Sequence, residues 1–374
     1  MKIGIDARTL VENRVGMGVY THEIIKQLNH IDTENEYYLY SNKKIYVDFK
    51  LNKNWKICEC HGKIGTFWLY FNLPKILNND NIDAFWGTQH CLPKRNKYTK
   101  NIKYILTVHD LAILKLKSVG EWKNTIIQKI FLKRSCKSSD KIVAVSMATK
   151  KDIVELLGLK DEKVDVIYEG TTPIEKCNLG KADEKKIIDK FNLKNKTYLF
   201  FLSTIEPRKN LDTIIKAFEI YKKESKDSLK FVISGGVGWK CKKTLKMIDD
   251  SEYKKDIIRT GYITKKEKEV LFKNCIAFMY PSLYEGFGLP VLEAMQRGAL
   301  VITSYISSLP EVAGNAAIYL KDVKNEKELE HIIKNVVNMK LDDKQKYINE
   351  GYEQIKKFTW EDCAGQVLAE FKEK

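Results

Sequence analysis

Two glutamates flank a glycine-rich turn in the second half of the chain, and their spacing could hold a ligand rich in hydroxyl groups. Glu285 and Glu293 stand on either side of Gly286 and Gly288, and Pro290 suits the first position of a following helix. The glycines allow a sharp turn whose amides approach a ligand, and the helix start suits a phosphate. Carboxylates only accept hydrogen bonds, so the segment predicts a site for sugar or ribose hydroxyls beside a diphosphate.

A cationic pair follows another predicted strand. Arg208 and Lys209 come directly after Pro207, and their planar fork and point charge suit two linked phosphates. The alternative is a solvated charge pair on the surface. For Glu293 alone, the alternative is a carboxylate that complements the helix dipole. The chain has no Asp-x-Asp triplet, which favours a leaving group held by cations and amides, and we expect no metal site.

The segment 284–294 resembles the Glu-x7-Glu signature of the retaining glycosyltransferases of family four, which have the GT-B fold. The resemblance continues through residues 295–312 and covers the turn at 203–210, most of the second half of the chain. It implies an α/β fold with two facing, doubly wound Rossmann-like domains and a central cleft. It also implies an enzyme that takes a nucleotide diphosphate sugar as substrate and needs no cofactor.

The resemblance also assigns roles to individual residues. In the first domain, His109 and Asp110 would lie at the cleft near the transferred sugar, although a lone histidine at a strand end is more often structural. The implied catalytic residues are His109, Asp110, Arg208, Lys209 and Glu285. The implied donor-binding residues are Gly16, Gly18, Arg208, Lys209, Gly235, Gly261, Tyr262, Ile263, Glu285, Gly286, Phe287, Gly288, Leu289 and Glu293. Ordinary turns are the alternative for the glycines at 16–18, 235 and 261.

Alternating short strands and helices position these residues. Apolar runs predict strands at 3–6, 102–108, 141–145, 164–168, 198–202, 230–234, 256–259, 276–280 and 300–303. Strands that alternate with helices favour parallel, doubly wound sheets, and such sheets bind ligands beyond the carboxyl ends of their strands. We expect an acceptor-side domain at 1–175, a polar linker at 170–196 and a nucleotide-sugar domain at 196–359. The family resemblance implies that the last helix, 360–374, packs back on the first domain.

Length and composition limit the function further. A chain of 374 residues suggests two domains, and no apolar run approaches the length of a membrane span. The N-terminus does not read as a signal peptide, and eight cysteines without a C-x-x-C pair suggest free thiols in a reducing cytoplasm. The net charge is +16, yet no nucleic-acid module appears, so we expect no nucleic-acid partner.

The basic charge is concentrated in the first half. Residues 51–150 hold 18 Lys and Arg against 6 Asp and Glu, and the aromatic run 67–71 lies in the same block. Such a block predicts peripheral contact with the anionic inner face of a membrane. Core packing is the alternative for the aromatic run, and solubility is the alternative for the lysines. The basic helix 122–137 does not separate its apolar and charged faces.

The motifs together predict a metal-independent, retaining hexosyltransferase. Several of them look most like mannosyltransferases of surface-polysaccharide assembly, so GDP-mannose is the expected donor and a glycan or lipid-linked glycan the acceptor. A UDP-sugar or another activated deoxysugar is the alternative donor. A sugar-nucleotide epimerase of the same fold and a non-catalytic binding protein are the alternative classes. Many members of the family carry Asn where this chain has Glu169, directly before the linker.

Overall fold

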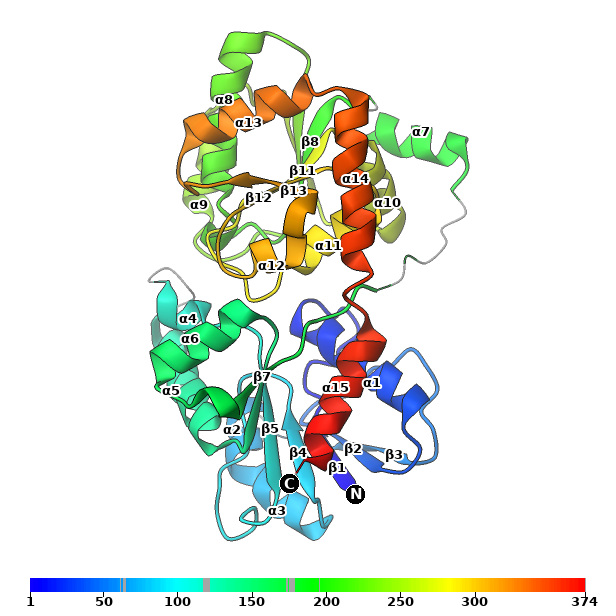
Figure 1. Cartoon of the computed structure of the whole chain (residues 1–374), viewed down its shortest axis with the longest axis vertical. Coiled ribbons are helices and arrows are strands. Elements are labelled where there is room, and N and C mark those ends of the chain that lie inside the picture. Colours follow the sequence, from blue (N-terminus) through cyan, green and yellow to red (C-terminus); the bar gives the residue numbers. More distant parts are fainter. Residues whose placement is uncertain are drawn as a thin grey trace. The chain divides into compact units, whose positions relative to one another are not determined.

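The structure is a computed structural model that describes residues 1–60, 62, 65–116, 122–172, 174, 179–194 and 196–373. The chain divides into two compact units (Figure 1). Unit 1 comprises Met1–Thr172 and Phe358–Lys374, and unit 2 comprises Pro173–Lys357.

Unit 1 is built on a parallel sheet whose described part has seven strands in the order β3-β2-β1-β4-β5-β6-β7. Its strands are β1 (Lys2–Asp6), β2 (Glu36–Ser41), β3 (Trp55–Glu59), β4 (Ala84–Gly87), β5 (Lys103–Val108), β6 (Lys141–Ala144) and β7 (Val164–Val166). Its helices are α1 (Met17–Ile31), α2 (Gly65–Phe67), the π-helix η1 (Trp68–Asn72), α3 (Leu73–Asn79), α4 (Ala112–Lys115), α5 (Trp122–Ser138), α6 (Met147–Leu157), η2 (Asp161–Lys163) and α15 (Trp360–Lys372).

Helix α1 shows how the apolar pattern builds this unit. Tyr20, Ile24 and Leu28 recur at helical spacing and are fully buried. Helix α15, from the far end of the chain, packs along α1, and the ring of Trp360 lies 6.0 Å from that of Tyr20. Figure 1 shows the two helices side by side in red and blue. The last helix therefore completes the core of the first unit.

Unit 2 has a second parallel sheet, and its described part has six strands in the order β10-β9-β8-β11-β12-β13. Its strands are β8 (Tyr198–Leu202), β9 (Lys230–Ser234), β10 (Ile257–Gly261), β11 (Ala277–Tyr280), β12 (Val301–Ser304) and β13 (Ala317–Leu320). Its helices are α7 (Lys181–Lys190), η3 (Pro207–Lys209), α8 (Leu211–Ser225), α9 (Lys242–Asp250), α10 (Lys265–Asn274), α11 (Leu289–Gln296), α12 (Leu309–Ala313), η4 (Gly314–Ala316), α13 (Glu326–Val337) and α14 (Leu341–Ile355).

Successive residues of the central strand β8 point to opposite faces of this sheet. Leu199 and Phe201 belong to the apolar cluster that includes Phe218 of α8 and Ile333 of α13. Phe200 instead packs edge-to-face against Phe272 of α10, with ring centroids 5.0 Å apart. Because helices cover both faces, β8 is apolar along its whole length, and this explains why the sequence shows it as a continuous run.

The doubly wound α/β architecture expected from the sequence is confirmed in both units. The strands β2, β3, β4 and β13 were not predicted, because tyrosines, lysines and short length mask their apolar pattern. Helix α7 lies inside the segment expected as a linker, and Lys190 at its end pairs with Glu267 of α10 at 2.5 Å. Seven of its ten residues are charged, and its apolar residues do not recur at helical spacing, so periodicity gave no sign of this helix.

No described helix is long and apolar enough to cross a membrane. Among the described residues, the seven cysteines are free thiols, and no cluster of His, Cys, Asp or Glu is arranged to hold a metal ion.

Candidate functional site

The loops that follow the strands of unit 2 are joined to one another by backbone hydrogen bonds. The amide of Leu283, after β11, donates to the carbonyl of Arg208, after β8, at 2.8 Å. The amide of Gly235, after β9, donates to the carbonyl of Gly261, at the end of β10, also at 2.8 Å. Predicted site residues from four strands are therefore gathered at the carboxyl edge of one sheet, where such sheets bind ligands.

A buried charge cluster forms the centre of this edge. Glu285 Oε1 accepts a hydrogen bond from Lys209 Nζ at 2.6 Å, and Glu285 Oε2 accepts one from Arg208 Nη1 at 3.0 Å. Lys209 Nζ also donates to the hydroxyl of Tyr280 at 2.5 Å. Three residues that the sequence predicted for the site therefore lie in direct contact. Their side chains are largely withdrawn from solvent, which strengthens the electrostatic interactions between them.

The charges in this cluster are mutually dependent. Burial by itself would raise the pKa of the Glu285 carboxyl. The positive charges of Arg208 and Lys209 lower it by a larger amount, so the pKa is about 2. Burial lowers the pKa of Lys209, and the carboxylate of Glu285 opposes this shift. The short contact between the two favours the ionised pair, and Glu285 is therefore an anion between two cations.

Neighbouring loops hold the cluster in place. Glu206 accepts a hydrogen bond from Arg208 Nε at 3.1 Å and another from Trp239 Nε1 at 2.9 Å. After β12, Ser307 Oγ accepts the amide proton of Glu285 at 2.9 Å, and Ser308 Oγ donates to the carbonyl of Phe287 at 2.6 Å. These contacts fix both the guanidinium group and the glycine-rich turn.

Glu293 belongs to a separate ion pair. It lies in α11, and its Oε1 accepts a hydrogen bond from Lys268 Nζ of α10 at 2.6 Å. Its side chain is 37% exposed, so it remains accessible to a ligand at the edge of the sheet. Helix α11 begins at Leu289 after Gly288, so Pro290 takes the second helical position, one residue later than expected.

The two other glycine turns of unit 2 lie close together. A Cβ on Gly235, whose φ is 123°, would lie 2.1 Å from the carbonyl oxygen of Ser203, so only glycine fits there. A Cβ on Gly236 would lie 2.3 Å from the hydroxyl of Tyr262. Tyr262 follows Gly261 and is 88% exposed, while Ile263 is half-buried. Tyr262 thus presents an aromatic face beside the turn after β9.

The two residues predicted for the site in unit 1, His109 and Asp110, differ in burial and in hydrogen-bond partners. His109, after β5, is buried, and its ring nitrogens lie 3.2 Å from Glu169 Oε1 and 3.0 Å from the carbonyl oxygen of Thr88. Asp110 is half-buried, and its Oδ1 accepts the amide proton of Ala112 at 2.9 Å. Glu169, the departure from the family pattern, is therefore the partner of the predicted histidine.

The glycines at the start of α1 serve that helix. Gly16 is its N-cap and has a φ of 52°. A Cβ on Gly18 would lie 2.9 Å from both the Arg14 side chain and the carbonyl oxygen of Thr9, so the preceding loop closes tightly over Gly18.

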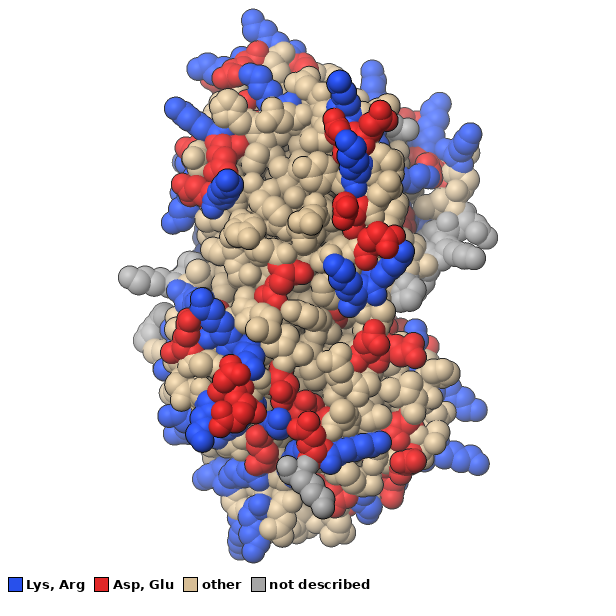
Figure 2. Space-filling model, in the orientation of Figure 1, with Lys and Arg blue, Asp and Glu red and all other residues tan. Residues whose placement is uncertain are grey.

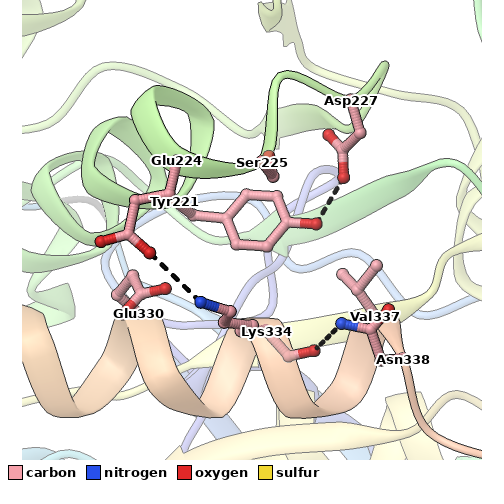
Figure 3. Close-up of a pocket in the computed structure, with 8 residues that line it drawn as sticks. All are labelled: Tyr221, Glu224, Ser225, Asp227, Glu330, Lys334, Val337 and Asn338. Carbon is pink, nitrogen blue, oxygen red and sulfur yellow. Dashed lines mark hydrogen bonds and ion pairs between the residues drawn. The ribbon is translucent and has the colours of Figure 1, made fainter.

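A hollow of about 250 Å³ lies elsewhere in unit 2, between α8 and α13 (Figure 3). It is lined by Tyr221, Glu224, Ser225, Asp227, Glu330, Lys334, Val337 and Asn338. Figure 3 shows the amine of Lys334 facing the carboxylate of Glu224, to which it donates at 3.2 Å. None of the residues predicted for the donor site lines this hollow.

Sequence reasoning missed the residues that position the predicted ones. Glu206, Tyr280 and Lys268 contact Arg208, Lys209 and Glu293, respectively. Glu206 lies in the motif turn 203–210 but was not singled out, and no motif pointed to the other two. His90 was also missed, although its place directly after β4, at the same sheet edge as His109, is a signal that strand assignment would have provided.

Comparison with known families identifies the chain. Residues 16–173 match the family described as Glycosyltransferase Family 4, and residues 183–354 match the family described as Glycosyl transferases group 1. The two matches together take in nearly the whole of both units. The chain belongs to the glycosyltransferases, with one domain of each of these two families.

Relatives of this glycosyltransferase include two enzymes of O-antigen chains. It is 27% identical to O-antigen chain mannosyltransferase B of Escherichia coli, over 77% of this chain and 74% of that one. It is also 27% identical to the O-antigen chain mannosyltransferase RfbU of Salmonella typhimurium, over 73% and 69% of the two chains. An uncharacterized glycosyltransferase of Methanocaldococcus jannaschii is 31% identical, over 65% and 61%.

Solved structures confirm the GT-B fold. The Anabaena protein HepE in complex with UDP and glucose superposes with a TM-score of 0.72 at 14% identity, over 100% of this chain and 99% of that one. WaaG, a glycosyltransferase involved in lipopolysaccharide biosynthesis, gives a TM-score of 0.72 at 11% identity, over 98% of each chain.

Proposed function

We propose that this glycosyltransferase moves mannose from GDP-mannose to a hydroxyl of a glycan or lipid-linked glycan in surface-polysaccharide assembly, with retention of the anomeric configuration. The observation that carries the proposal is the similarity to two O-antigen mannosyltransferases over about three quarters of the chain. A UDP-sugar is the alternative donor, since backbone groups of a turn such as that at 261–263 would make most contacts with the base, and such contacts discriminate poorly between bases.

The charge cluster of unit 2 supports a role in releasing the nucleoside diphosphate. Negative charge develops on the diphosphate as the glycosidic bond breaks, and preorganised cations stabilise that charge. Lys209 Nζ carries three protons, so a hydrogen bond to a phosphate oxygen is compatible with those to Glu285 and Tyr280. Glu285 orients both cations and is a candidate ligand for sugar hydroxyls.

The proposed transfer balances without a metal or an enzymic nucleophile. The bond between the sugar C1 and the β-phosphate oxygen breaks, and a bond between C1 and the acceptor oxygen forms on the same face. The acceptor proton passes to the leaving phosphate, whose charge is held by Arg208 and Lys209. This route requires cations in fixed positions, and hydrogen bonds to Glu285 hold Arg208 and Lys209 in place.

Turnover with defined donors tests the proposal. Purified protein is incubated with GDP-mannose, GDP-fucose, UDP-glucose or UDP-N-acetylglucosamine and with octyl α-D-mannopyranoside, with and without EDTA. We expect transfer from GDP-mannose, an α-linked product by NMR and unchanged activity in EDTA. Transfer from a UDP-sugar alone would overturn the donor, and loss of activity in EDTA with recovery on addition of manganese would overturn metal independence.

The role of the cations has its own test. Arg208→Ala and Lys209→Ala should each lower kcat/KM about a hundredfold or more, because each removes a group that stabilises developing charge. Lys243→Ala is the matched control, since Lys243 is 80% exposed and should leave turnover unchanged. Near-normal turnover in Arg208→Ala would show that the pair of Arg208 and Lys209 has a structural role and no catalytic one.

We also propose that unit 1 contacts an anionic membrane surface. In the segment 67–71, Trp68 and Leu69 are buried, whereas Phe67 and Phe71 are 41% and 57% exposed. Ile130 of α5 is 44% exposed, and the same helix carries Lys129, Lys133, Arg134 and Lys137. Exposed apolar side chains beside lysines suit the interface of a membrane with anionic lipids.

A further inference from the structure

The backbone at His90 adopts a conformation that side chains rarely take. His90 follows β4, and its φ is 55°, in the left-handed region. Non-glycine residues in that region cost free energy and persist where the surrounding structure holds them, often at functional sites. The loop holds His90 with its ring half-buried, beside the ring of His109, with centroids 5.7 Å apart.

The hydrogen bond to His90 determines which ring nitrogen carries its proton. The backbone amide of His109 donates to Nε2 of His90 at 2.9 Å, so Nε2 is an acceptor. A neutral imidazole with an accepting Nε2 carries its proton on Nδ1. Burial and the neighbouring His109 lower the pKa of His90 to about 4, which keeps the ring neutral at physiological pH. His90 Nδ1 is therefore a hydrogen-bond donor.

His109 differs from His90, because both of its ring nitrogens lie within hydrogen-bonding distance of groups of unit 1. The carbonyl oxygen of Thr88 can only accept, so His109 Nε2 must donate to it. His109 Nδ1 lies 3.2 Å from Glu169 Oε1, and the ring packs edge-to-face on Tyr20 at 4.7 Å. His109 is thus a positioning residue, which fixes His90 through its own amide.

The groups around His90 suit a polyhydroxylated ligand. In the described part of the chain, His90 Nδ1 makes no hydrogen bond to a protein group. Gln89 is half-buried next to it, and Asp110, also half-buried, follows His109. A neutral N–H donor, an amide and a carboxylate along one sheet edge can bind the donors and acceptors of adjacent sugar hydroxyls.

We propose that unit 1 has an acceptor-binding site centred on His90, in which the Nδ1–H group donates to a hydroxyl oxygen of the acceptor glycoside. The site explains why the loop after β4 holds a strained histidine and why the amide of His109 points at its ring. The choice of a mannoside as the acceptor rests on the proposed function.

Two substitutions separate the contribution of the Nδ1–H group of His90, a hydrogen-bond donor, from that of its Nε2 atom, a hydrogen-bond acceptor. An asparagine at position 90 places its side-chain amide near the position of Nδ1, and asparagine tolerates a positive φ. A glutamine places its polar atoms near Nε2 instead. Initial rates are measured with octyl α-D-mannopyranoside at saturating GDP-mannose, and GDP affinity is measured by calorimetry.

We expect His90→Gln to raise the KM for octyl α-D-mannopyranoside about threefold to tenfold, the value of one hydrogen bond, with GDP affinity unchanged. His90→Asn should stay close to wild type, and His331→Gln, at an exposed histidine of unit 2, is the control. A rise in the donor KM alone would overturn the proposal. Loss in His90→Asn with His90→Gln close to wild type would also overturn it, by showing that only the bond from the His109 amide to Nε2 matters.

Two further measurements test the acceptor site independently of the proposal that GDP-mannose is the donor. Long-range proton–nitrogen NMR spectra of the imidazole rings report the tautomer, and a proton on His90 Nε2 would contradict the assignment without any substrate. Calorimetry with octyl α-D-mannopyranoside tests binding by itself, and wild-type protein that does not bind it overturns the mannoside site. If GDP-mannose is not consumed while this binding depends on His90, the proposed donor fails and the acceptor site stands.

Discussion

Glu285 neutralises the buried Lys209 and the half-buried Arg208, and its charge therefore affects stability as well as the proposed chemistry. Removing one partner of a buried ion pair leaves the other charges uncompensated, which typically costs about 3–5 kcal/mol. Glu285 contacts Arg208 and Lys209 at 3.0 and 2.6 Å, and without it Lys209 would lose its carboxylate partner, whereas Arg208 would keep Glu206. The same residue thus links the fold of unit 2 to the arrangement of its site.

The first prediction concerns the pH dependence of this stabilisation. The pKa of Glu285 is about 2 in the folded chain and 4.5 ordinarily, so its contribution is present above pH 4.5 and is lost as the pH falls toward 2. Glu285→Gln should melt below wild type at pH 7, and the gap in Tm should narrow between about pH 4.5 and 2. Glu224→Gln, at an exposed ion pair, is the control, and a gap that stays constant with pH would contradict the prediction.

The second prediction concerns Glu293. We expect it to bind the ribose hydroxyls of the nucleotide, so Glu293→Gln should weaken GDP binding about tenfold to a hundredfold by calorimetry. Its ion pair with Lys268 is partly exposed and contributes about 0–1 kcal/mol, so the Tm should hardly change. Glu224→Gln should leave GDP affinity unaltered, and an unaltered affinity in Glu293→Gln would remove this residue from the site.

At the scale of elements, the contact between the loop after β7 and helix α15 ties the end of the chain to unit 1. The amide of Thr171 donates to the carbonyl of Phe358 at 3.0 Å, and Trp360 Nε1 donates to Thr172 Oγ1 at 3.2 Å. Gly170 lies against the start of α15, where a Cβ would be 2.2 Å from the backbone nitrogen of Trp360.

The third prediction follows from that close approach. Gly170→Ala should displace α15 and destabilise the protein by about 1–3 kcal/mol, as overpacking does, with a lower Tm in a calorimetric scan. Gly365→Ala is the matched control, because Gly365 lies inside α15 with open space around its Cβ position. It should stabilise the helix by about 0.5–1 kcal/mol. Equal Tm values for the two variants would contradict the close contact.

At the scale of the whole molecule, the net charge is +16, of which residues 51–150 contribute +12. Figure 2 shows Lys and Arg side chains interspersed with Asp and Glu on the face drawn, without a single continuous basic patch. Membrane contact would therefore depend on a local combination of lysines and exposed apolar side chains, such as that of η1 and α5, more than on total charge.

The fourth prediction tests this combination. The protein should bind vesicles with anionic lipids at low salt and release them at high salt, because the attraction decays over a Debye length. Phe71→Ser with Ile130→Ser should weaken binding about tenfold in sedimentation, since two exposed apolar side chains are lost. Leu341→Ser, at an exposed leucine of unit 2, is the control. Equal binding to neutral vesicles would reject an electrostatic contribution.

The sequence by itself determined the fold class and most of the central strands. Strands such as β8 and β11 are buried on both faces, so their apolar runs are continuous and visible without a structure. The glycine turn before α11 was also visible, because the backbone of glycine is permissive and that of proline is restricted wherever they stand in a chain. These signals are local, and a local signal survives in a single sequence.

Tertiary structure alone decided which residues meet. Glu285 and Lys209 are 76 positions apart, and His109 and Glu169 are 60 apart, yet each pair is in contact. Such pairs depend on strand order and on loop conformations, such as the positive φ of His90, that one sequence does not encode in any recognisable pattern. Residue types therefore indicated the chemistry, but the protonation of each group and its partners follow from which strands lie side by side.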